Sequence, residues 1–264
     1  MSTPASTWTV EAAAKILLEA EATRTDRHPI TDDWPALDLQ TAYQVQAALI
    51  ADKVAHGAKI VGVKLGLTSA AKQRRMGISS PLTAWLTDDM VLEPGAPLKI
   101  NDLIHPRVEP EIVFVLDKRL AGPGVTRESA LAAVGSVYCG LEVIDSRYTD
   151  FKFTLPDVVA DNASSAKFVV GELKCDAGEL DLALEACALS VNGNVVDSAT
   201  GAAVQGHPAE ALALAANALA ERGIALESGW IVLTGGMTDA VFIEPGNQIA
   251  AEFTHLGSVA IAGA

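Results

Sequence analysis

The pattern of apolar and polar positions along the chain changes near residue 60. Before that point the pattern predicts two helices, over the segments TVEAAAKILLEA and DLQTAYQVQAALIADKVAHG. Thr9 is a suitable N-cap for the first helix, with Glu11 in its first turn, and the second helix would start at Asp38 and stop at Gly57. The linker DRHPITDDWPALD, rich in proline and aspartate, separates them. We therefore expect a helical N-terminal segment over residues 1–58.

After residue 60 the pattern predicts mostly strands. The strand segments are KIVGVKLGLTS, RVEPEIVFVL, VYCGLEVIDS, AKFVVG, ALSVNGNVVDS, WIVLTGG and QIAAEFTHLGSVAIAG. The Asn192-Gly193 pair predicts a type I′ hairpin. One helix interrupts the strands, PAEALALAANALAERG, with Pro208 at its first position and Gly223 just past its end. Because strands and helices do not alternate regularly, we expect an α+β fold rather than a doubly wound sheet, with residues 59–264 forming a curved, mostly antiparallel β-rich domain.

Two glutamates interrupt the apolar pattern of the predicted strand HPRVEPEIVFVL. Strand side chains alternate between faces, so Glu109 and Glu111 project from one face together with Val113 and Val115. Burying two neighbouring carboxylates is costly, so the pair needs a cation, a shared proton or open solvent. Glu142 is a third carboxylate inside an apolar strand. If the two strands are neighbours, the three carboxylates converge, and a hard divalent cation such as Mg²⁺ is their natural counter-ion.

A simpler arrangement also satisfies the same residues. The E-x-E pair could lie on a solvated strand edge, which Pro110 would tolerate, while Glu142 pairs with Arg147 or Lys64. Lys64 itself interrupts the apolar run VGVKLGL. If Lys64 is buried, it needs an acidic partner or an anionic ligand; the alternative is a lysine that extends to solvent from a strand edge.

Two polar loops are further candidates for holding an anionic group. Their polar positions are Asp161, Asn162, Ser164 and Ser165 in VVADNASSAKF, and Thr234, Gly235 and Gly236 in VLTGGM. Hydroxyl groups and backbone N–H groups in such loops can hold a carboxylate. Either loop could equally be an ordinary capping or turn element.

Composition and charge narrow the class of partner. The chain has 264 residues, half of them apolar, and a formal net charge of −14. That charge argues against nucleic acid or an anionic membrane as partner, and it requires a locally positive site, such as a metal, for any anionic substrate. No apolar run approaches the ~20 residues of a membrane span, and the N-terminus lacks the layout of a secretory signal. The three scattered cysteines are typical of core residues in a reducing compartment, so we expect a cytoplasmic protein.

Several segments together carry a resemblance to a known family. They are VGVKLGLTS, HPRVEPEIVFVL, GLEVIDSRYTDFKF, DVVADNASS, GHPAEALALAANAL and VLTGGMTDAV. In this order they resemble the 2-oxopent-4-enoate hydratase / 4-oxalocrotonate decarboxylase family, of the fumarylacetoacetate hydrolase fold superfamily, which acts in meta-cleavage catabolism of aromatic compounds. The resemblance implies a β-roll of the fumarylacetoacetate hydrolase C-terminal type, with residues 59–264 as the catalytic domain.

The resemblance also implies roles for individual residues. Glu109, Glu111 and Glu142 match the family's ligands for Mg²⁺ or Mn²⁺, Lys64 matches its active-site lysine, and Ser164 matches a serine near the substrate carboxylate. We expect the substrate to contact Leu82, Asn162, Ser164, Thr234 and Gly235. A small-molecule 2-oxo dicarboxylate would be the substrate, and the protein would be a homo-oligomer that can also associate with the hydratase of its pathway.

Within the family, the decarboxylase branch matches better. Hydratases carry an acid in a P-D-Y/F-G segment, and Leu82 stands at the acid's place here. The resemblance therefore implies decarboxylation of 2-oxohex-3-enedioate to 2-hydroxypenta-2,4-dienoate and CO₂, with the metal as electron sink. Three alternatives stay open: hydration of 2-oxopent-4-enoate, hydrolysis of acylpyruvates, and a non-catalytic partner subunit. The intact set of glutamates and Lys64 argues against the last, and the dispersed histidines argue against hydrolysis.

Overall fold

The N-terminal segment folds into helices, as the sequence predicts. In this computed structural model, which describes residues 8–69, 73–74, 77–78 and 80–264, the helices are α1 (Val10–Thr23), α2 (Ile30–Asp33) and α3 (Leu39–Ala55). The hydroxyl of Thr9 accepts a hydrogen bond from the N–H of Ala12, and the carboxylate of Asp38 accepts one from the N–H of Thr41. Both predicted N-caps are therefore confirmed.

Helix α2 lies inside the linker, where the sequence does not indicate a helix. The carboxylate of Asp157, far along the chain, accepts hydrogen bonds from the N–H and the hydroxyl of Thr31 at 2.9 and 2.6 Å. A helix of four residues has little stability of its own. Its formation depends on this tertiary contact, which local sequence patterns do not reveal.

The β-rich part contains two sheets in the described residues. The larger has the order β2-β1-β8-β3-β4-β5, with β9 paired to β3, and the smaller has the order β11-β10-β6-β7. The strands of the larger sheet are β1 (Ile60–Gly66), β2 (Leu82–Thr87), β3 (Arg107–Leu116), β4 (Val134–Ile144), β5 (Ser165–Val170), β8 (Ile231–Leu233) and β9 (Val241–Phe242). Those of the smaller sheet are β6 (Ala186–Val191), β7 (Asn194–Thr200), β10 (Gln248–Phe253) and β11 (Ser258–Ala262). The β1–β8 pair is parallel and the others are antiparallel, which confirms a mostly antiparallel body.

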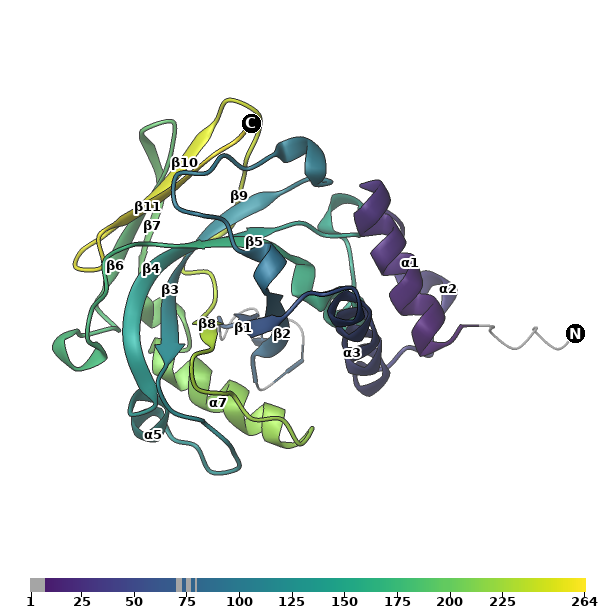
Figure 1. Cartoon of the computed structure of the whole chain (residues 1–264), viewed down its shortest axis with the longest axis horizontal. Coiled ribbons are helices and arrows are strands. Elements are labelled where there is room, and N and C mark those ends of the chain that lie inside the picture. The colour runs from purple at the N-terminus through teal and green to yellow at the C-terminus, as the bar shows by residue number, and fades with distance from the viewer. Residues whose placement is uncertain (1–7, 70–72, 75–76, 79) are drawn as a thin grey trace, which may run out of the picture.

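Helices close the open sides of this curled sheet. Among the described residues, the α-helices of the β-rich part include α5 (Arg127–Leu131), α6 (Leu155–Ala160) and α7 (Pro208–Ala220). Short 3₁₀ helices cover Asp88–Met90, Ile100–Asp102, Thr149–Phe151, Asn162–Ser164, Ala177–Glu179 and Gly201–Ala203. Figure 1 shows β3 and β4 as long curved strands, with α7 lying across the concave side and α1 to α3 at the opposite end from β6 and β7. The main core fills the space between the sheets and α7.

The N-terminal helices share a second core with later parts of the chain. Leu17 of α1 and Leu49 of α3 pack in one cluster with Leu82, Tyr148 and Val158. The buried side chain of Gln46 donates hydrogen bonds to the carbonyls of Thr83 and Val159, each at 3.1 Å. The helical segment is thereby joined to β2 and α6, next to the end of β1 that carries Lys64.

Strand β2 is the main element that the sequence does not predict. It pairs antiparallel with β1, with Ala84 opposite Lys64. On its outer side, the amide of Asn162 both accepts from the N–H and donates to the carbonyl of Trp85, each at 2.9 Å. A side chain thus satisfies the free edge of the sheet, which is a tertiary arrangement and leaves no periodic signal in the segment SSPLTAWLT.

The expected hairpin is confirmed. Asn192 and Gly193 both have positive φ, of 51° and 78°, as a type I′ turn between β6 and β7 requires. Helix α7 begins at Pro208 as predicted, and Gly223 follows its end with a φ of 71°.

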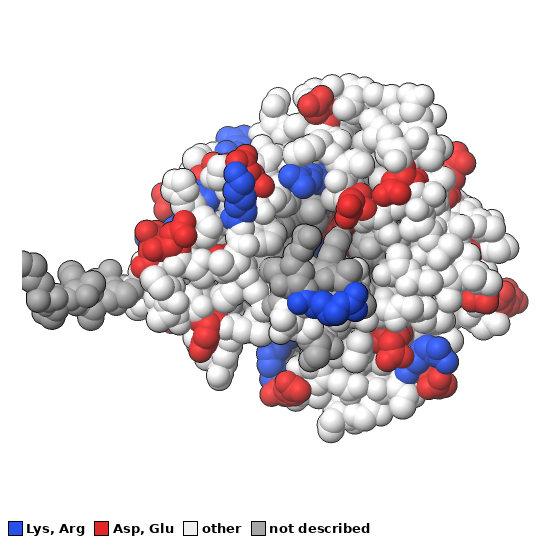
Figure 2. Space-filling view, turned by 180° about the vertical axis from the view of Figure 1, so that it is seen from behind, with Lys and Arg blue, Asp and Glu red and all other residues white. Residues whose placement is uncertain are grey.

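The surface of the protein carries both acidic and basic side chains, and the chain has a net negative charge. Figure 2 shows acidic and basic side chains scattered over one face, without an extended basic patch on the described part of that face. Among the described residues, no helix is both long enough and apolar enough to span a membrane.

Gly62 is expected to be essential for the parallel β1–β8 pair. A Cβ at this position would lie 1.9 Å from the carbonyl oxygen of Ile231, on the backbone of β8. Gly62→Ala should therefore lower the free energy of unfolding by at least about 2 kcal/mol, since a backbone cannot yield as a side chain can. Gly66→Ala in the same strand is the matched control, because its Cβ would meet only side chains at 3.7 and 3.8 Å. Equal thermal unfolding of the two variants would contradict the close packing of β1 on β8.

Candidate metal centre and adjoining cavity

Three glutamates converge on one face of the large sheet. Strands β3 and β4 are antiparallel neighbours, with Glu109 directly opposite Glu142 and Glu111 opposite Gly140. One carboxylate oxygen from each of Glu109, Glu111 and Glu142 lies within 4.8 Å of the others. The predicted convergence is confirmed. The solvated-edge alternative is wrong, because β3 lies between β4 and β8, and Glu111 and Glu142 are fully buried.

Each buried glutamate uses one oxygen within the protein and leaves the other unsatisfied. Glu111 accepts a hydrogen bond on Oε2 from the N–H of Gly235 at 2.6 Å. Glu142 accepts on Oε1 from Lys64 Nζ at 2.8 Å and from the Ser165 hydroxyl at 3.3 Å. Glu111 Oε1 and Glu142 Oε2 are buried and have no hydrogen-bond partner. Buried polar atoms are rarely left unpaired, so this donor set fits a hard divalent cation with oxygen ligands.

Electrostatics also favour a cation at the cluster. Burial raises the pKa of Glu111 well above its ordinary value, and repulsion from Glu142 and Glu109 raises it further. The hydrogen bond from Gly235 and the charge of Lys64 oppose this shift only in part. A divalent ion at the cluster would allow all three carboxylates to remain ionised.

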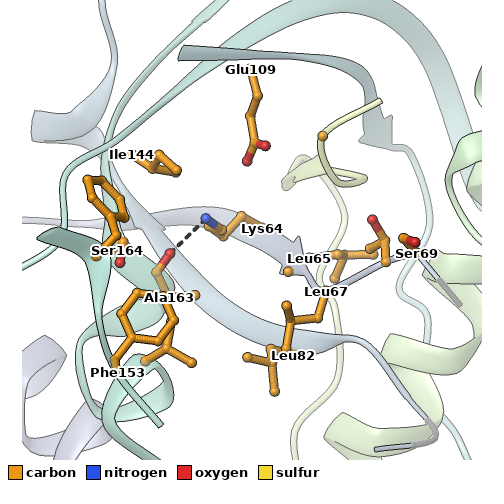
Figure 3. Close-up of a pocket in the computed structure, with 15 residues that line it drawn as sticks. Lys64, Leu65, Leu67, Ser69, Leu82, Glu109, Ile144, Phe153, Ala163 and Ser164 are labelled. Atoms are coloured by element: carbon orange, nitrogen blue, oxygen red, sulfur yellow. Dashed lines mark hydrogen bonds between the residues drawn. The ribbon is translucent and has the colours of Figure 1, made fainter. Parts of the chain in front are cut away.

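Lys64 lies at the floor of the same site. Its side chain is 4% exposed, and Nζ donates to the carbonyl of Ala163 at 2.9 Å, as Figure 3 shows, and to Glu142. Burial acts to lower the pKa of Lys64, but the charges of Glu142, Glu109 and Glu111 outweigh it, so the net pKa lies above the ordinary value. The solvent-exposed alternative for Lys64 is wrong, since β1 is an inner strand between β2 and β8.

The VLTGGM loop packs against Glu109 and Glu111 of β3. Gly235 has a φ of 114°, and a Cβ there would lie 2.1 Å from Thr68 Oγ1. A Cβ on Gly236 would lie 2.1 Å from Oε2 of Glu109. The hydroxyl of Thr234 donates to the carbonyl of Ile112 at 2.7 Å. The structure therefore directs Thr234 and the N–H of Gly235 toward β3, while Gly236 lines the cavity.

The VVADNASS loop also divides into two groups of residues. Asp161 forms an ion pair with the buried guanidinium of Arg147, and the Asn162 amide bonds the backbone of Trp85. Ser164 does line the cavity, and its hydroxyl donates to Asp161 at 3.2 Å. Asn162, Ala163 and Ser164 all have positive φ, of 48°, 51° and 57°, a strained run that directs the Ala163 carbonyl at Lys64. Arg147 is thus paired with Asp161, and it is not the partner of Glu142.

A cavity of about 240 Å³ adjoins the glutamates. Figure 3 shows Glu109 on one side and Leu82 and Phe153 on the other, with Lys64 between them. Apolar side chains form most of its wall: Leu65, Leu67, Leu82, Ile144, Phe151, Phe153 and Val158. Polar groups are provided by Lys64, Thr68, Ser69, Glu109 and Ser164. The cavity can therefore hold a charged head at the glutamates and an apolar or uncharged portion farther away.

Sequence reasoning misses most of the apolar wall. Ile144 is the last residue of β4, and Phe151, with a φ of 56°, ends the 3₁₀ helix Thr149–Phe151. Phe153 follows that helix, and Val158 lies in α6. Apolar residues at a strand end, in a loop or in a short helix have no periodic signal that distinguishes a cavity wall from a core, so only the tertiary structure brings them together.

Comparisons with known proteins match this architecture over nearly the whole chain. The family model for the fumarylacetoacetate (FAA) hydrolase C-terminal domain matches residues 59–261. A 4-oxalocrotonate decarboxylase from Pseudomonas putida is 41% identical over 250 residues, covering 95% of each chain. A 2-hydroxyhexa-2,4-dienoate hydratase from Comamonas testosteroni is 39% identical over 254 residues, covering 96% of each chain.

One solved structure is also similar over nearly the full length of both chains. The 4-oxalocrotonate decarboxylase from Pseudomonas putida G7, complexed with magnesium and adipate, superposes with a TM-score of 0.95 at 40% identity. The match covers 98% of this chain and 100% of that one. Together with the family match and the sheet topology, these relatives show that the chain belongs to the fumarylacetoacetate (FAA) hydrolase C-terminal family.

Proposed function

We propose that this protein is a Mg²⁺-dependent carboxy-lyase that converts 4-oxalocrotonate (2-oxohex-3-enedioate) to 2-hydroxypenta-2,4-dienoate and CO₂. The observation that carries the proposal is the buried Glu109, Glu111 and Glu142 cluster with its two unsatisfied oxygens, beside a largely apolar cavity. The similar Pseudomonas putida G7 enzyme, named for this reaction, is complexed with magnesium and with adipate, a saturated six-carbon dicarboxylate. Adipate has the chain length and the two carboxylates of the proposed substrate.

Each residue of the site has a distinct proposed role. Glu109, Glu111 and Glu142 would hold Mg²⁺, and Mn²⁺ would suit the same oxygen ligands. When bound, Mg²⁺ supplies Lewis-acid stabilisation of the negative charge that develops on the 2-oxo oxygen. Lys64, held protonated by its neighbours, provides a hydrogen bond or a proton at the reacting end of the substrate. Ser164 would contact the 1-carboxylate, and Thr234 and Gly235 would act by positioning Glu111 and its strand.

The apolar end of the cavity would promote loss of the distal carboxylate. Leu82 is 3% exposed and stands there with Phe153, opposite Glu109 (Figure 3). A carboxylate placed against these side chains is poorly solvated, whereas neutral CO₂ is not penalised. The same wall excludes the water that a hydratase must deliver. Asn162 is not part of this contact set, since both ends of its amide bond the backbone of Trp85.

Direct product analysis tests the proposal. Purified protein with Mg²⁺ should release CO₂ from 2-oxohex-3-enedioate and form the five-carbon dienol, and chelation should abolish the release. Absence of CO₂, with efficient hydration of 2-oxopent-4-enoate by the same preparation, would overturn it.

Hydration is the second candidate, because the Comamonas testosteroni relative at 39% identity is named a hydratase. Leu82 separates the two candidates, since the hydratase pattern has an acid at this place. Leu82→Asp should slow CO₂ release at least several-fold, because a like charge beside the departing carboxylate costs a kcal/mol or more in a partly dry site. Leu82→Asn is the matched control, with the same shape and no charge. CO₂ release should be measured at saturating Mg²⁺, and equal rates in the two variants would contradict charge repulsion at this wall.

Assembly and location complete the proposal. We expect a homo-oligomer that can also associate with the hydratase that uses its product. Leu184 and the strand β7 residues Val195 and Val196 support an interface, since each exposes more than half of its surface. Light scattering of the protein alone and mixed with such a hydratase would test both associations.

The three cysteines are free, consistent with a cytoplasmic enzyme.

A further inference from the structure

A second cavity, of about 760 Å³, shares Leu82 with the cavity beside Glu109. Residues of α3, the start of β2 and the end of α7 line it. Leu39, Tyr43 and Ala47 of α3 face it, as expected for residues four apart on one helical face. Arg222, just after α7, also lines this cavity, which we call the Arg222 cavity.

Arg222 is held in place by two neighbours. Its guanidinium lies 3.9 Å from the centre of the Tyr43 ring and donates a hydrogen bond to the hydroxyl of Thr83. Thr83 precedes Ala84, which pairs with Lys64 of β1. The stacked guanidinium cannot turn freely, so its remaining N–H groups have a defined direction.

Arg222 forms no ion pair with a described carboxylate, although Glu221 lines the same cavity. Burial lowers the pKa of Arg222, and attraction from Tyr43 and Glu221 only partly offsets this. Glu221 is exposed, and no described carboxylate forms an ion pair with Arg222, whereas the buried Arg147 is paired with Asp161. A half-buried cation with free donors in a cavity is a binding site for an anion, because the ligand's charge offsets the desolvation of the guanidinium.

The walls define the rest of the ligand. Most of the other lining residues are aromatic or aliphatic, including Tyr43, Leu82, Trp85 and Ile224. The remaining ones are Gln40, Gln44, Ser80 and Glu221. Such a surface favours a flat apolar body over a hydrated inorganic ion. We propose that the Arg222 cavity binds a small planar monocarboxylate, aromatic or conjugated, with its carboxylate on Arg222 and its body against Trp85 and Leu82.

Leu82 links this cavity to the active site. The same side chain lines both cavities, so a ligand in the Arg222 cavity fixes the position of the wall that faces the proposed substrate. We expect coupling through this shared side chain, and any such coupling must change the affinity of both cavities by the same factor. The Arg222 cavity is thus a candidate regulatory site for an acid of the same chemical class as aromatic starting compounds or linear dienoate products.

Calorimetric titration tests the proposal. The protein is first saturated with Mg²⁺ and oxalate, which occupy the metal centre, and is then titrated with benzoate and, separately, with 2,4-hexadienoate. Each acid lacks the 2-oxo group needed to chelate. We expect one equivalent of binding for at least one acid and none for neutral benzamide. Tighter binding of benzoate would identify an aromatic ligand, and tighter binding of hexadienoate a linear one.

Variants locate the site. Arg222→Leu should weaken binding at least roughly tenfold, as expected for loss of a charge-assisted hydrogen bond, and Arg222→Lys should restore part of it. Arg119→Leu is the matched control, because Arg119 is an exposed arginine paired with Glu227. Gln44, an exposed residue of α3 at the rim of the cavity, provides a test that spares the core. Gln44→Glu should weaken binding and Gln44→Lys should strengthen it.

The outcomes that overturn the proposal are definite. They are absence of binding of both acids to the wild type at millimolar concentration, or binding that none of the Arg222 and Gln44 variants changes. Failure of oxalate to bind would count against the metal centre instead, and the opposite effects of the two Gln44 variants would still test the Arg222 cavity.

Discussion

Lys64→Met is expected to lower the rate of CO₂ release by at least ~10²-fold, the lower range for loss of a catalytic proton-transfer group. Methionine keeps most of the volume of the buried stem but removes the ammonium group that contacts Ala163 and Glu142. Strand β1 keeps its backbone pairing with β2 and β8, so the fold should remain. Steady-state rates with saturating substrate and Mg²⁺ measure the effect.

The binding of Mg²⁺ distinguishes a chemical role for Lys64 from a structural one. Removing a positive charge beside three carboxylates should leave Mg²⁺ affinity unchanged or tighter, because the ammonium and the metal ion repel each other. Lys59→Met, at an exposed lysine just before β1, is the matched control and should keep full activity. A Lys64→Met enzyme with an unchanged rate would remove Lys64 from the proposed mechanism.

Glu111→Gln is expected to weaken Mg²⁺ binding by more than ~100-fold, since even supporting residues around a metal ligand contribute up to that factor. Glutamine can keep the hydrogen bond from the N–H of Gly235 through its amide oxygen. Its NH₂ group would then replace Oε1, the oxygen that has no partner in the protein. Calorimetric titration with Mg²⁺ measures the loss, and Glu252→Gln on β10, an exposed strand glutamate, is the matched control.

The same substitution should stabilise the metal-free protein. Burial and repulsion raise the pKa of Glu111 in the folded state above its ordinary value of 4.5, so the folded protein holds this proton more tightly than the unfolded chain. The stability that protonated Glu111 contributes is therefore fully present below about pH 4.5 and is lost as pH rises toward the folded pKa. In metal-free buffer, the thermal midpoint of Glu111→Gln should exceed that of the wild type by an amount that grows as pH rises above this value.

Addition of Mg²⁺ should reverse the order of stability. The wild type gains stability from a ligand that binds only the folded state, and Glu111→Gln gains little. If chelated wild-type protein were as stable as Glu111→Gln at neutral pH, the proposed repulsion within the cluster would be absent. If Mg²⁺ failed to stabilise the wild type, the three glutamates would not form the metal site.

The amino-acid sequence by itself determined the features that rest on local rules. The starts of α1 and α3 follow from the caps Thr9 and Asp38, and the β6–β7 turn follows from Asn192-Gly193. The E-x-E spacing placed Glu109 and Glu111 on one strand face, because side-chain direction in a strand depends only on residue parity. Those rules require no knowledge of distant neighbours, and the structure confirms each of these predictions.

Tertiary structure decided which side chains contact each other, and therefore whether the polar residues are buried partners or lie at solvated edges. The register of β3 on β4 sets Glu109 opposite Glu142, and the enclosure of β1 between β2 and β8 makes Lys64 a buried partner rather than an exposed one. Asn162 was expected at the substrate but bonds the edge of β2, an element without a periodic pattern. Such pairings depend on contacts between residues far apart in sequence, whose energies no local pattern encodes. The Arg222 cavity also depends on such contacts, because three separate elements form it.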